Sequence, residues 1–209
     1  MRNIVVVDNP DQWDVPMENA DIVGARTFLS DPHYSDSDRM RVFNLCRSYR
    51  YRSLGYYASL LAEARGQKVF PRVETILDLA NQFIARLITT EVDDLIQKSL
   101  RQIKSKDFIL SIYFGRNLAK QYDDISWQLF SLFQAPLLRA RFVHDDDQWR
   151  LQSINAISID EVAEVHREFL VDAAREYFGR RKVSSVRRPA YKYDMAILVN
   201  PEEKEPPSD

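Results

Sequence analysis

Arginine and tyrosine side chains alternate in one short segment, residues 44–57, which reads NLCRSYRYRSLGYY. A guanidinium group binds a carboxylate or a phosphate through two parallel hydrogen bonds. Tyrosine adds a stacking surface and a hydroxyl, and glycine allows a close approach to the backbone. The segment therefore predicts a site for an anionic ligand, with the candidate binding residues Asn44, Arg47, Tyr49, Arg50, Tyr51, Arg52, Ser53, Gly55 and Tyr56.

The place of this segment in the chain favours the same chemistry. It lies between a predicted strand, residues 41–46, and a predicted helix that has Ser53 as its N-cap. Ligands of open α/β sheets bind at the carboxyl ends of the strands, and a helix N-terminus offers free N–H groups to an anion. Asp8 and Asn9, at the end of the first predicted strand, join the site if the first and third strands are neighbours.

The charge distribution leaves a structural alternative open. Residues 1–38 hold eight acidic and two basic side chains, whereas residues 39–72 hold eight basic side chains and one acidic side chain. The arginines of the segment could therefore pair with the acidic block, while the tyrosines pack at the rim of the core. Structural ion pairs and functional sites use the same residue types, so composition alone does not decide between them.

Other candidate chemistry is weaker. The thiol of Cys46 lies beside arginines that would favour a nucleophilic thiolate, but a buried structural thiol is the alternative. The aspartates 145–147 could bind a divalent cation or form a solvated turn. The basic run 180–188 could bind nucleic acid in a salt-sensitive way or serve as a connector. The three histidines have no metal-site spacing.

The composition excludes several functional classes. The chain has 209 residues and five glycines, all more than ten residues apart, so it contains no dinucleotide loop, P-loop or nucleophile elbow. The net charge of −2 does not indicate nucleic acid or membrane as a partner. No apolar run reaches the roughly 18 residues of a membrane span, and the N-terminus lacks a secretory pattern. We therefore predict a cytoplasmic protein without a complete active site.

Hydrophobic patterning predicts the elements that position the candidate site. Strands are expected at residues 3–8, 21–25, 41–46, 108–114 and 193–199, with a hairpin at 137–143 and 148–154. Helices are expected after Ser53, over residues 76–103 with a break near Thr89, over 125–133, and after the capping box of Ser158 and Glu161. This order predicts a mixed α/β, three-layer sandwich that is Rossmann-like in its first half and has a late antiparallel hairpin.

The stretch 42–66, which contains the arginine–tyrosine segment, resembles the RLAN domain, the N-terminal domain of RimK-like ATP-grasp ligases. Residues 5–10 (VVVDNP), residues 193–199 (YDMAILV) and the closing PPSD support the resemblance. It covers essentially the whole chain. It implies an RLAN-like domain over residues 1–200 and an acidic, proline-containing tail or linker to a catalytic domain over residues 201–209.

RimK-like ATP-grasp enzymes use ATP and magnesium to activate a carboxylate as an acyl phosphate, which an amine then attacks. The resemblance implies a role in such ligation of amino acids or peptides, with the catalytic residues, ATP and magnesium in the ATP-grasp region and no catalytic residue, cofactor or metal on this chain. The main hypothesis is a non-catalytic domain that recognises or positions the substrate. Its partners would be an ATP-grasp domain, in cis or in trans, and an amino acid, peptide or protein substrate.

Three alternatives stay open. One is a nucleic-acid-binding module that uses the basic blocks 39–72 and 180–192, although nucleic acid is not the expected partner. Another is a structural or dimerisation domain with the 76–103 helix as its interface, and homo-oligomerisation is left open. A third is an enzyme in its own right that acts through Cys46.

Overall fold

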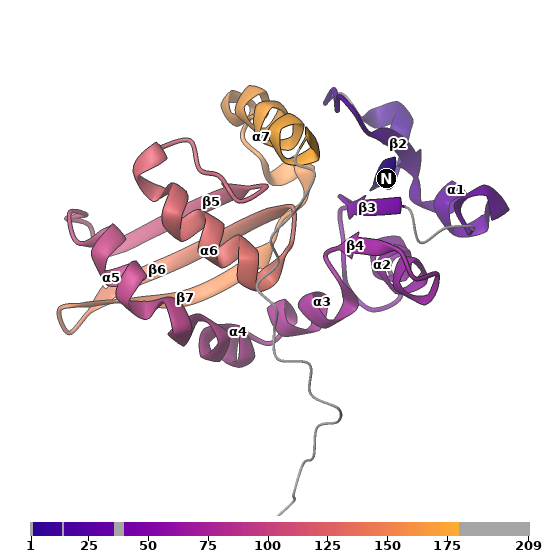
Figure 1. Cartoon of the computed structure of the whole chain (residues 1–209). Helices are drawn as coiled ribbons and strands as arrows, with labels where there is room; N and C mark the ends of the chain where they lie inside the picture. The colour runs from indigo at the N-terminus through magenta and orange to yellow at the C-terminus, as the bar shows by residue number, and fades with distance from the viewer. Residues whose placement is uncertain (1, 14, 36–39, 180–209) are drawn as a thin grey trace, which may run out of the picture.

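Two β-sheets share one core in the computed structural model, which describes residues 2–13, 15–35 and 40–179. The first sheet is parallel and has the strand order β2-β1-β3-β4, with β1 (Arg2–Val7), β2 (Asp21–Gly24), β3 (Met40–Asn44) and β4 (Lys68–Phe70). The second is antiparallel, with the order β5-β6-β7 formed by β5 (Asp107–Tyr113), β6 (Leu137–Asp145) and β7 (Gln148–Ala156). Figure 1 shows the two sheets side by side.

The parallel sheet is buried on both faces, as its continuous apolar strands require. Helices α1 (Ala25–Ser30) and α2 (Leu54–Ala64) cover one face, where Ile4, Val6 and Val42 pack on helical residues such as Phe28. Alternate residues, such as Val5 and Phe43, face the larger core on the other side. In Figure 1 the parallel sheet accordingly stands between α1 and α2 on the right and the second sheet on the left.

The antiparallel sheet packs one face against a series of short helices. These are α3 (Val73–Ala80), α4 (Gln82–Thr89), α5 (Asp93–Leu100) and α6 (Asp123–Phe133). Along β6, Leu138, Ala140 and Phe142 are fully buried, whereas the alternating Arg139 and Arg141 are not. This alternation is typical of an antiparallel sheet with one solvated face.

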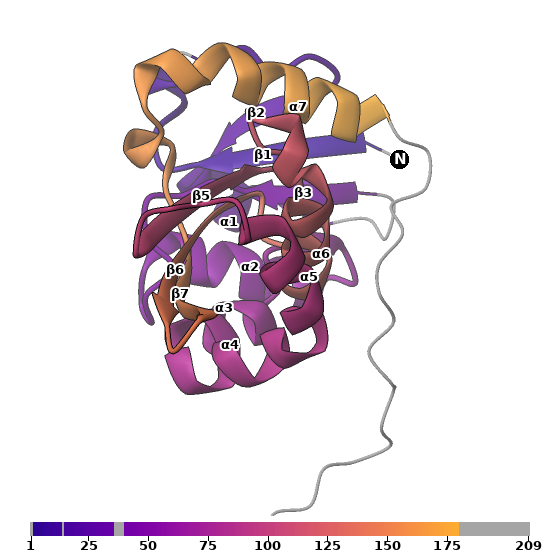
Figure 2. The ribbon, with the colours of Figure 1, turned by 90° about the vertical axis from the view of Figure 1, so that its left-hand side faces the viewer.

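Helix α7 (Arg167–Gly179) joins the two sheets through aromatic side chains. The ring of Phe43 on β3 lies 4.7 Å from that of Phe178 and 5.8 Å from that of Tyr177, both on α7. It also lies 6.1 Å from the ring of Phe114, which follows β5. In Figures 1 and 2 alike, α7 lies at the top of the molecule and α4 at the bottom, so the two helices enclose the core from opposite sides.

The predicted mixed α/β fold is confirmed, and two of its helices need correction. The expected helix 76–103 is divided among α3, α4 and α5. The expected break near Thr89 is confirmed by the 3₁₀ turn Thr90–Val92 between α4 and α5. The break at Asn81 was not expected: its backbone is extended after α3, and its side chain caps α4 by accepting from the N–H groups of Phe83 and Ile84. The capping box of Ser158 and Glu161 exists, but it caps a single 3₁₀ turn, and α7 begins only at Arg167.

Other elements lay beyond the predictions. Strand β4 and helix α1 were not predicted at all. The expected strand 193–199, the basic run within 180–192 and the tail 201–209 lie outside the described residues. No helix in the described part of the chain is long and apolar enough to cross a membrane.

Candidate functional site

The arginine–tyrosine segment begins at the carboxyl edge of the parallel sheet, where β1 and β3 lie side by side. Val6 on β1 pairs with Asn44 on β3, and the backbone N–H of Leu45 donates to the carbonyl of Val6 at 2.8 Å. Two residues further along each chain segment, the Asp8 carboxylate accepts a hydrogen bond of 2.6 Å from the backbone N–H of Arg47. Asp8 is therefore part of this edge and is engaged by the loop that leaves β3.

Asn44 holds the loop together from inside. Its side chain is fully buried, and its amide nitrogen donates to the carbonyl of Gly55 at 2.6 Å and to the hydroxyl of Ser59 at 2.9 Å. Its amide oxygen accepts from the N–H of Cys46 at 3.2 Å, and its backbone carbonyl accepts from the Tyr49 hydroxyl at 2.6 Å. The polar groups of Asn44 and Tyr49 thus form hydrogen bonds within the loop and with α2.

Ser53 and Gly55 fasten the loop to the start of α2. The Ser53 hydroxyl accepts from the N–H of Tyr56 at 3.1 Å, as an N-cap does, and donates to the carbonyl of Ser48 at 2.8 Å. A Cβ on Gly55 would lie 2.3 Å from that carbonyl oxygen and 2.8 Å from the Cβ of Cys46. The loop therefore lies directly against the N-terminus of α2, and only glycine leaves room for it.

Cys46 is a buried thiol beneath the same loop. Its sulfur lies 3.8 Å from the carbonyl oxygen of Val6, and burial, reinforced by the Asp8 carboxylate, raises the pKa of the thiol far above its ordinary range. Burial likewise raises the pKa of Tyr49, with smaller contributions from Cys46 and Asp8. Both groups stay protonated at neutral pH, which argues against a nucleophilic role for Cys46.

The three arginines of the segment differ in their surroundings. The Nε of Arg47 lies 2.8 Å from the Asp160 carboxylate, and both side chains are more than half exposed. Arg52 has a φ of 70°, and its guanidinium lies 5.5 Å from the centre of the Tyr51 ring. Within the described part of the chain, neither Arg50 nor Arg52 forms an ion pair. The described acidic residues of the block 1–38 therefore do not pair with these two arginines.

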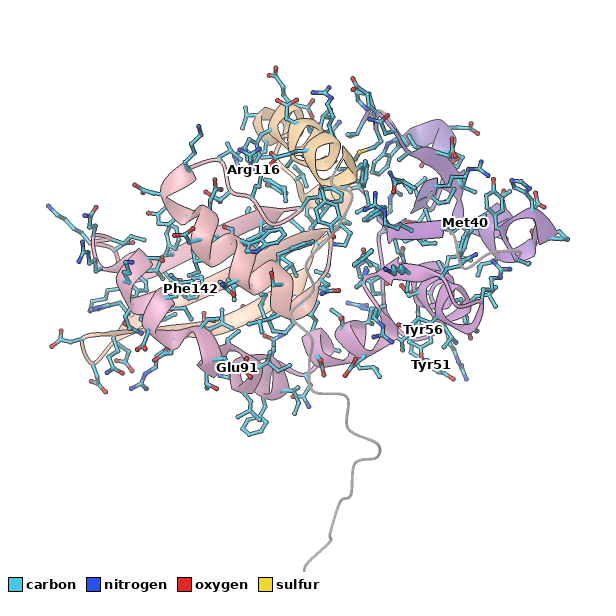
Figure 3. All side chains as sticks on the ribbon, viewed as in Figure 1. Met40, Tyr51, Tyr56, Glu91, Arg116 and Phe142 are labelled. Atoms are coloured by element: carbon cyan, nitrogen blue, oxygen red, sulfur yellow. The ribbon has the colours of Figure 1, made fainter. Side chains whose placement is uncertain are left out.

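Three tyrosines continue this surface from the loop onto α2, of which Tyr51 and Tyr57 are exposed and Tyr56 is half-buried. Tyr51 is 71% exposed, its ring lies 5.5 Å from that of Tyr56, and the ring of Tyr56 lies 5.8 Å from that of Tyr57. Figure 3 shows Tyr51 and Tyr56 next to each other at the rim of the molecule. We call Arg50, Tyr51, Arg52, Tyr56 and Tyr57 the tyrosine–arginine patch.

The basic block 39–72 is dispersed over the fold. Arg41 is buried, donating to the Asn3 side chain and to the carbonyl of Phe178. Arg65 donates to the carbonyls of Phe28, Leu29 and Tyr34. Arg72 pairs with Glu63 at 2.9 Å. These arginines serve the structure, so the block does not form one continuous cationic surface.

The remaining predicted candidates also have local roles. Asn9 accepts from the N–H of Asp11 and so caps the 3₁₀ turn Pro10–Gln12. Asp146 and Asp147 have positive φ angles of 48° and 60° and form the two-residue turn between β6 and β7. The hydroxyl of Tyr113 lies 2.9 Å from the Nδ1 of His166. Among the described residues, no group of three histidine, cysteine or acidic side chains could hold a metal ion.

Two features of this region escaped the sequence reasoning. Asp160 reaches Arg47 although the two are far apart in the chain, and no local pattern predicts that contact. An apolar groove of about 380 Å³ also opens beside the tyrosine–arginine patch, between α1 and α2. Its lining residues are Leu29, Tyr57, Leu60, Leu61 and Ala64. The four lining residues of α2 are spaced at i, i+3, i+4 and i+7, and this helical spacing is the sequence pattern that could have indicated the groove.

Comparisons with known proteins give one family. Residues 25–173 match the family described as the RimK-like ATP-grasp N-terminal domain. No curated protein matches the sequence.

Solved structures resemble the fold only loosely. ATP-grasp ligase PsnB, complexed with a phosphomimetic variant of a minimal precursor, Mg and ADP, has a TM-score of 0.49 at 9% identity, covering 84% of this chain and 97% of that one. D-alanine–D-alanine ligase from Bacillus anthracis complexed with ATP has a TM-score of 0.49 at 11% identity, covering 85% and 97%. Macrocyclase MdnB from Microcystis aeruginosa has a TM-score of 0.46 at 9% identity, covering 85% and 100%.

At these TM-scores and identities, no ligand or residue role transfers to this chain. The family match spans well over half of the chain, and it includes the whole arginine–tyrosine segment. The chain belongs to the family of RimK-like ATP-grasp N-terminal domains.

Proposed function

We propose that this chain is the non-catalytic, substrate-recognising domain of an ATP-dependent carboxylate–amine ligase, and that the tyrosine–arginine patch binds a carboxylate-bearing peptide. One observation carries the proposal. Asn44, Tyr49, Ser53 and Gly55 form the inside of the loop, which holds Arg50 and Arg52 on its surface without a carboxylate partner among the described residues. A loop built in this way presents cations at a fixed place, and pre-organisation lowers the entropic cost of binding.

The chemistry of the patch suits an acidic peptide. Each guanidinium can bind a carboxylate through two parallel hydrogen bonds, which gives direction as well as charge attraction. Tyr51 and Tyr56 offer rigid, amphipathic surfaces that pack on a peptide chain at a low entropic cost. Arg47, which is already paired with Asp160, has a positioning role in this proposal.

We assign ATP and magnesium to the ATP-grasp region on the basis of the family. The one helix N-terminus that the sequence suggested for a phosphate, that of α2, is filled by the Ser53 hydroxyl and the Ser48 carbonyl. The residues of this chain therefore do not fit a nucleotide at that place. We also propose that residues 1–200 form the domain and residues 201–209 a linker to the catalytic region.

Ligation kinetics with the ATP-grasp part test this function. We expect the variant with both Arg50→Ala and Arg52→Ala to raise KM for a peptide substrate by about 10-fold or more, because one lost charge-assisted contact at an interface corresponds to about 1.4 kcal/mol. The kcat should stay unchanged, since the patch holds no reacting atom. Arg101→Ala, at an exposed position distant in sequence, is the control for loss of charge. An unchanged KM in the double variant would exclude the patch as the substrate site.

A second candidate function, homo-oligomerisation, is favoured by apolar residues outside the core. Phe83 and Leu87, one turn apart on α4, are 67% and 57% exposed, and Leu77 on α3 is 57% exposed. These residues give a dimer interface an apolar centre. Sedimentation velocity over a range of concentrations tests it: a dimer that Phe83→Ser dissociates supports this function, and a monomer at every concentration rejects it.

A further inference from the structure

Helix α2 carries its large apolar residues on its outer side. The residues that face the sheet are small and buried, namely Gly55, Ala58, Ser59 and Ala62. Tyr57 and Leu60, in contrast, are 40% and 41% exposed, and together with Leu61 and Ala64 they form a second apolar stripe. A surface helix ordinarily turns polar residues toward the solvent, whereas this stripe packs only partly against α1 and leaves apolar side chains exposed.

The stripe forms one wall of the groove between α1 and α2, and Leu29 of α1 forms the other. A groove of about 380 Å³ is at the small end of ligand sites, which span roughly 300–1,000 Å³. It accommodates one or two side chains, whereas an entire helix, about 10 Å across, needs a longer trough. The size of the groove therefore points to a side-chain anchor of an extended peptide.

The groove is continuous with the tyrosine–arginine patch. Tyr57 lines the groove, and the chain of ring contacts from Tyr57 through Tyr56 to Tyr51 ends at the Arg52 guanidinium. On α1, Arg26 precedes the lining residue Leu29 by one turn, is exposed and forms no ion pair within the described residues. Basic side chains thus occur on both elements that border the apolar groove, and the complementary partner carries acidic residues around an apolar one.

We propose that this groove is the anchor pocket for the acidic peptide substrate of the ligase, taking one large aliphatic side chain while neighbouring carboxylates bind Arg50 and Arg52. The inference rests on the proposed function and adds a sequence preference to it: acidic residues around a central leucine-like residue. Burial of that side chain removes apolar surface of both partners from water. The groove therefore contributes affinity that is independent of the charges.

Fluorescence anisotropy with the intact chain tests the anchor. The probes are a labelled peptide with acidic residues around a central leucine and the same peptide with serine in place of leucine. We expect the leucine peptide to bind about 10-fold more tightly, as for one buried aliphatic side chain. Leu60→Ser should remove this preference, and Ala64→Phe, which fills the groove from an exposed position, should do the same. Leu118→Ser is the matched control, because Leu118 is 43% exposed and lies outside the groove.

The outcomes separate the anchor from the proposed function. If both peptides bind equally, and Arg52→Ala weakens both while Leu60→Ser changes neither, the anchor is refuted and the carboxylate-binding patch stands. If the leucine peptide binds with the same affinity after Arg50→Ala and Arg52→Ala, the acidic class of ligand is refuted. Binding of neither peptide refutes both. A dimer that Leu60→Ser dissociates would identify a second copy of the chain as the occupant and overturn the proposal.

Discussion

Replacing Gly55 by alanine tests whether the arginine–tyrosine segment is built as the structure shows. Inside a helix this change ordinarily stabilises a protein by about 1 kcal/mol. Here the added Cβ would lie 2.3 Å from the Ser48 carbonyl oxygen, which must retreat by about 1 Å to reach the 3.4 Å of an ordinary contact. Gly55→Ala should therefore destabilise the protein, in contrast to the ordinary stabilising effect of this change in a helix.

The size of this destabilisation follows from the hydrogen bonds that are disturbed when the Ser48 carbonyl moves away. The Ser48 carbonyl accepts the Ser53 hydroxyl at 2.8 Å, and the Gly55 carbonyl accepts the Asn44 amide at 2.6 Å. A hydrogen bond of this kind contributes about 1 kcal/mol, and overpacking costs about 1–3 kcal/mol. With one of these bonds lost and the helix gain subtracted, we expect Gly55→Ala to lower the free energy of unfolding by about 1–3 kcal/mol.

Urea unfolding measures this change. With a slope of about 2 kcal/mol per molar urea for a chain of this size, the midpoint should fall by about 1 M. Gly179→Ala is the matched control, because a Cβ at Gly179 meets no atom of the described residues within 4 Å, and its midpoint should stay near that of the wild type. A midpoint of Gly55→Ala equal to or above that of the wild type would refute the described packing of the loop on α2.

Three further predictions concern the Cys46 thiol and two ion pairs. Because burial raises the pKa of Cys46, a thiol reagent at about pH 8 should label the folded chain slowly and the urea-unfolded chain fast; rapid labelling of the folded chain would contradict this. The hydrogen bond from Arg141 lowers the pKa of Asp107, so the pair stabilises the fold above the ordinary aspartate pKa and loses that contribution as the pH falls through the lowered value. Arg141→Ala should return the Asp107 pKa to its ordinary value in an NMR titration, and an unchanged pKa would reject the pairing. A double-mutant cycle of Arg47→Ala and Asp160→Asn should give a coupling below about 1 kcal/mol, as for exposed pairs, whereas a coupling above about 2 kcal/mol would mean that the pair is shielded from solvent.

Local patterns in the sequence were sufficient for every described strand except β4 and for the place of the arginine–tyrosine segment. The run Ile-Val-Val-Val of β1 is buried throughout, and Ser53 caps α2 as its residue type predicts. The arginine–tyrosine segment follows β3 at the carboxyl edge, as the order of the elements required. These features depend on neighbouring residues only, which is why one sequence reveals them.

The inner face of α2 could not be predicted in the same way. By helical spacing, Leu54, Tyr57, Ala58 and Leu61 form the apolar face of this helix. Of these four only Ala58 is fully buried, and the other buried residues of α2 are the small Gly55, Ser59 and Ala62, which let the helix approach the sheet closely. Ser59 is tolerated there because its hydroxyl donates to the carbonyl of Pro71 and accepts from Asn44. Partners that lie 12 and 15 positions away supply these bonds, so no local periodicity reveals them.

The break at Asn81 has a similar cause. The apolar rhythm runs through this position without interruption, and only the structure shows that the backbone is extended at Asn81 and that α3 and α4 pack on β7 as separate helices. Asparagine is a good N-cap, but in a long amphipathic pattern a single residue of this type does not outweigh the period.

The residues of the segment form two groups. The folding of the loop requires the buried group but does not require the residues on the loop surface. Asn44, Tyr49, Ser53 and Gly55 each satisfy a buried group or avoid a clash, so the fold alone accounts for them. Tyr51, 71% exposed, gains from Arg52 only an exposed cation–π contact worth about 0.5–1 kcal/mol. Arg52 holds a positive φ, which is unfavourable for a residue with a side chain. The positive φ of Arg52 belongs to a turn in which the Ser53 N–H donates to the Arg50 carbonyl at 2.9 Å. The exposed guanidinium beside an exposed aromatic ring adds little to stability, which favours the proposed contact with a partner outside the chain.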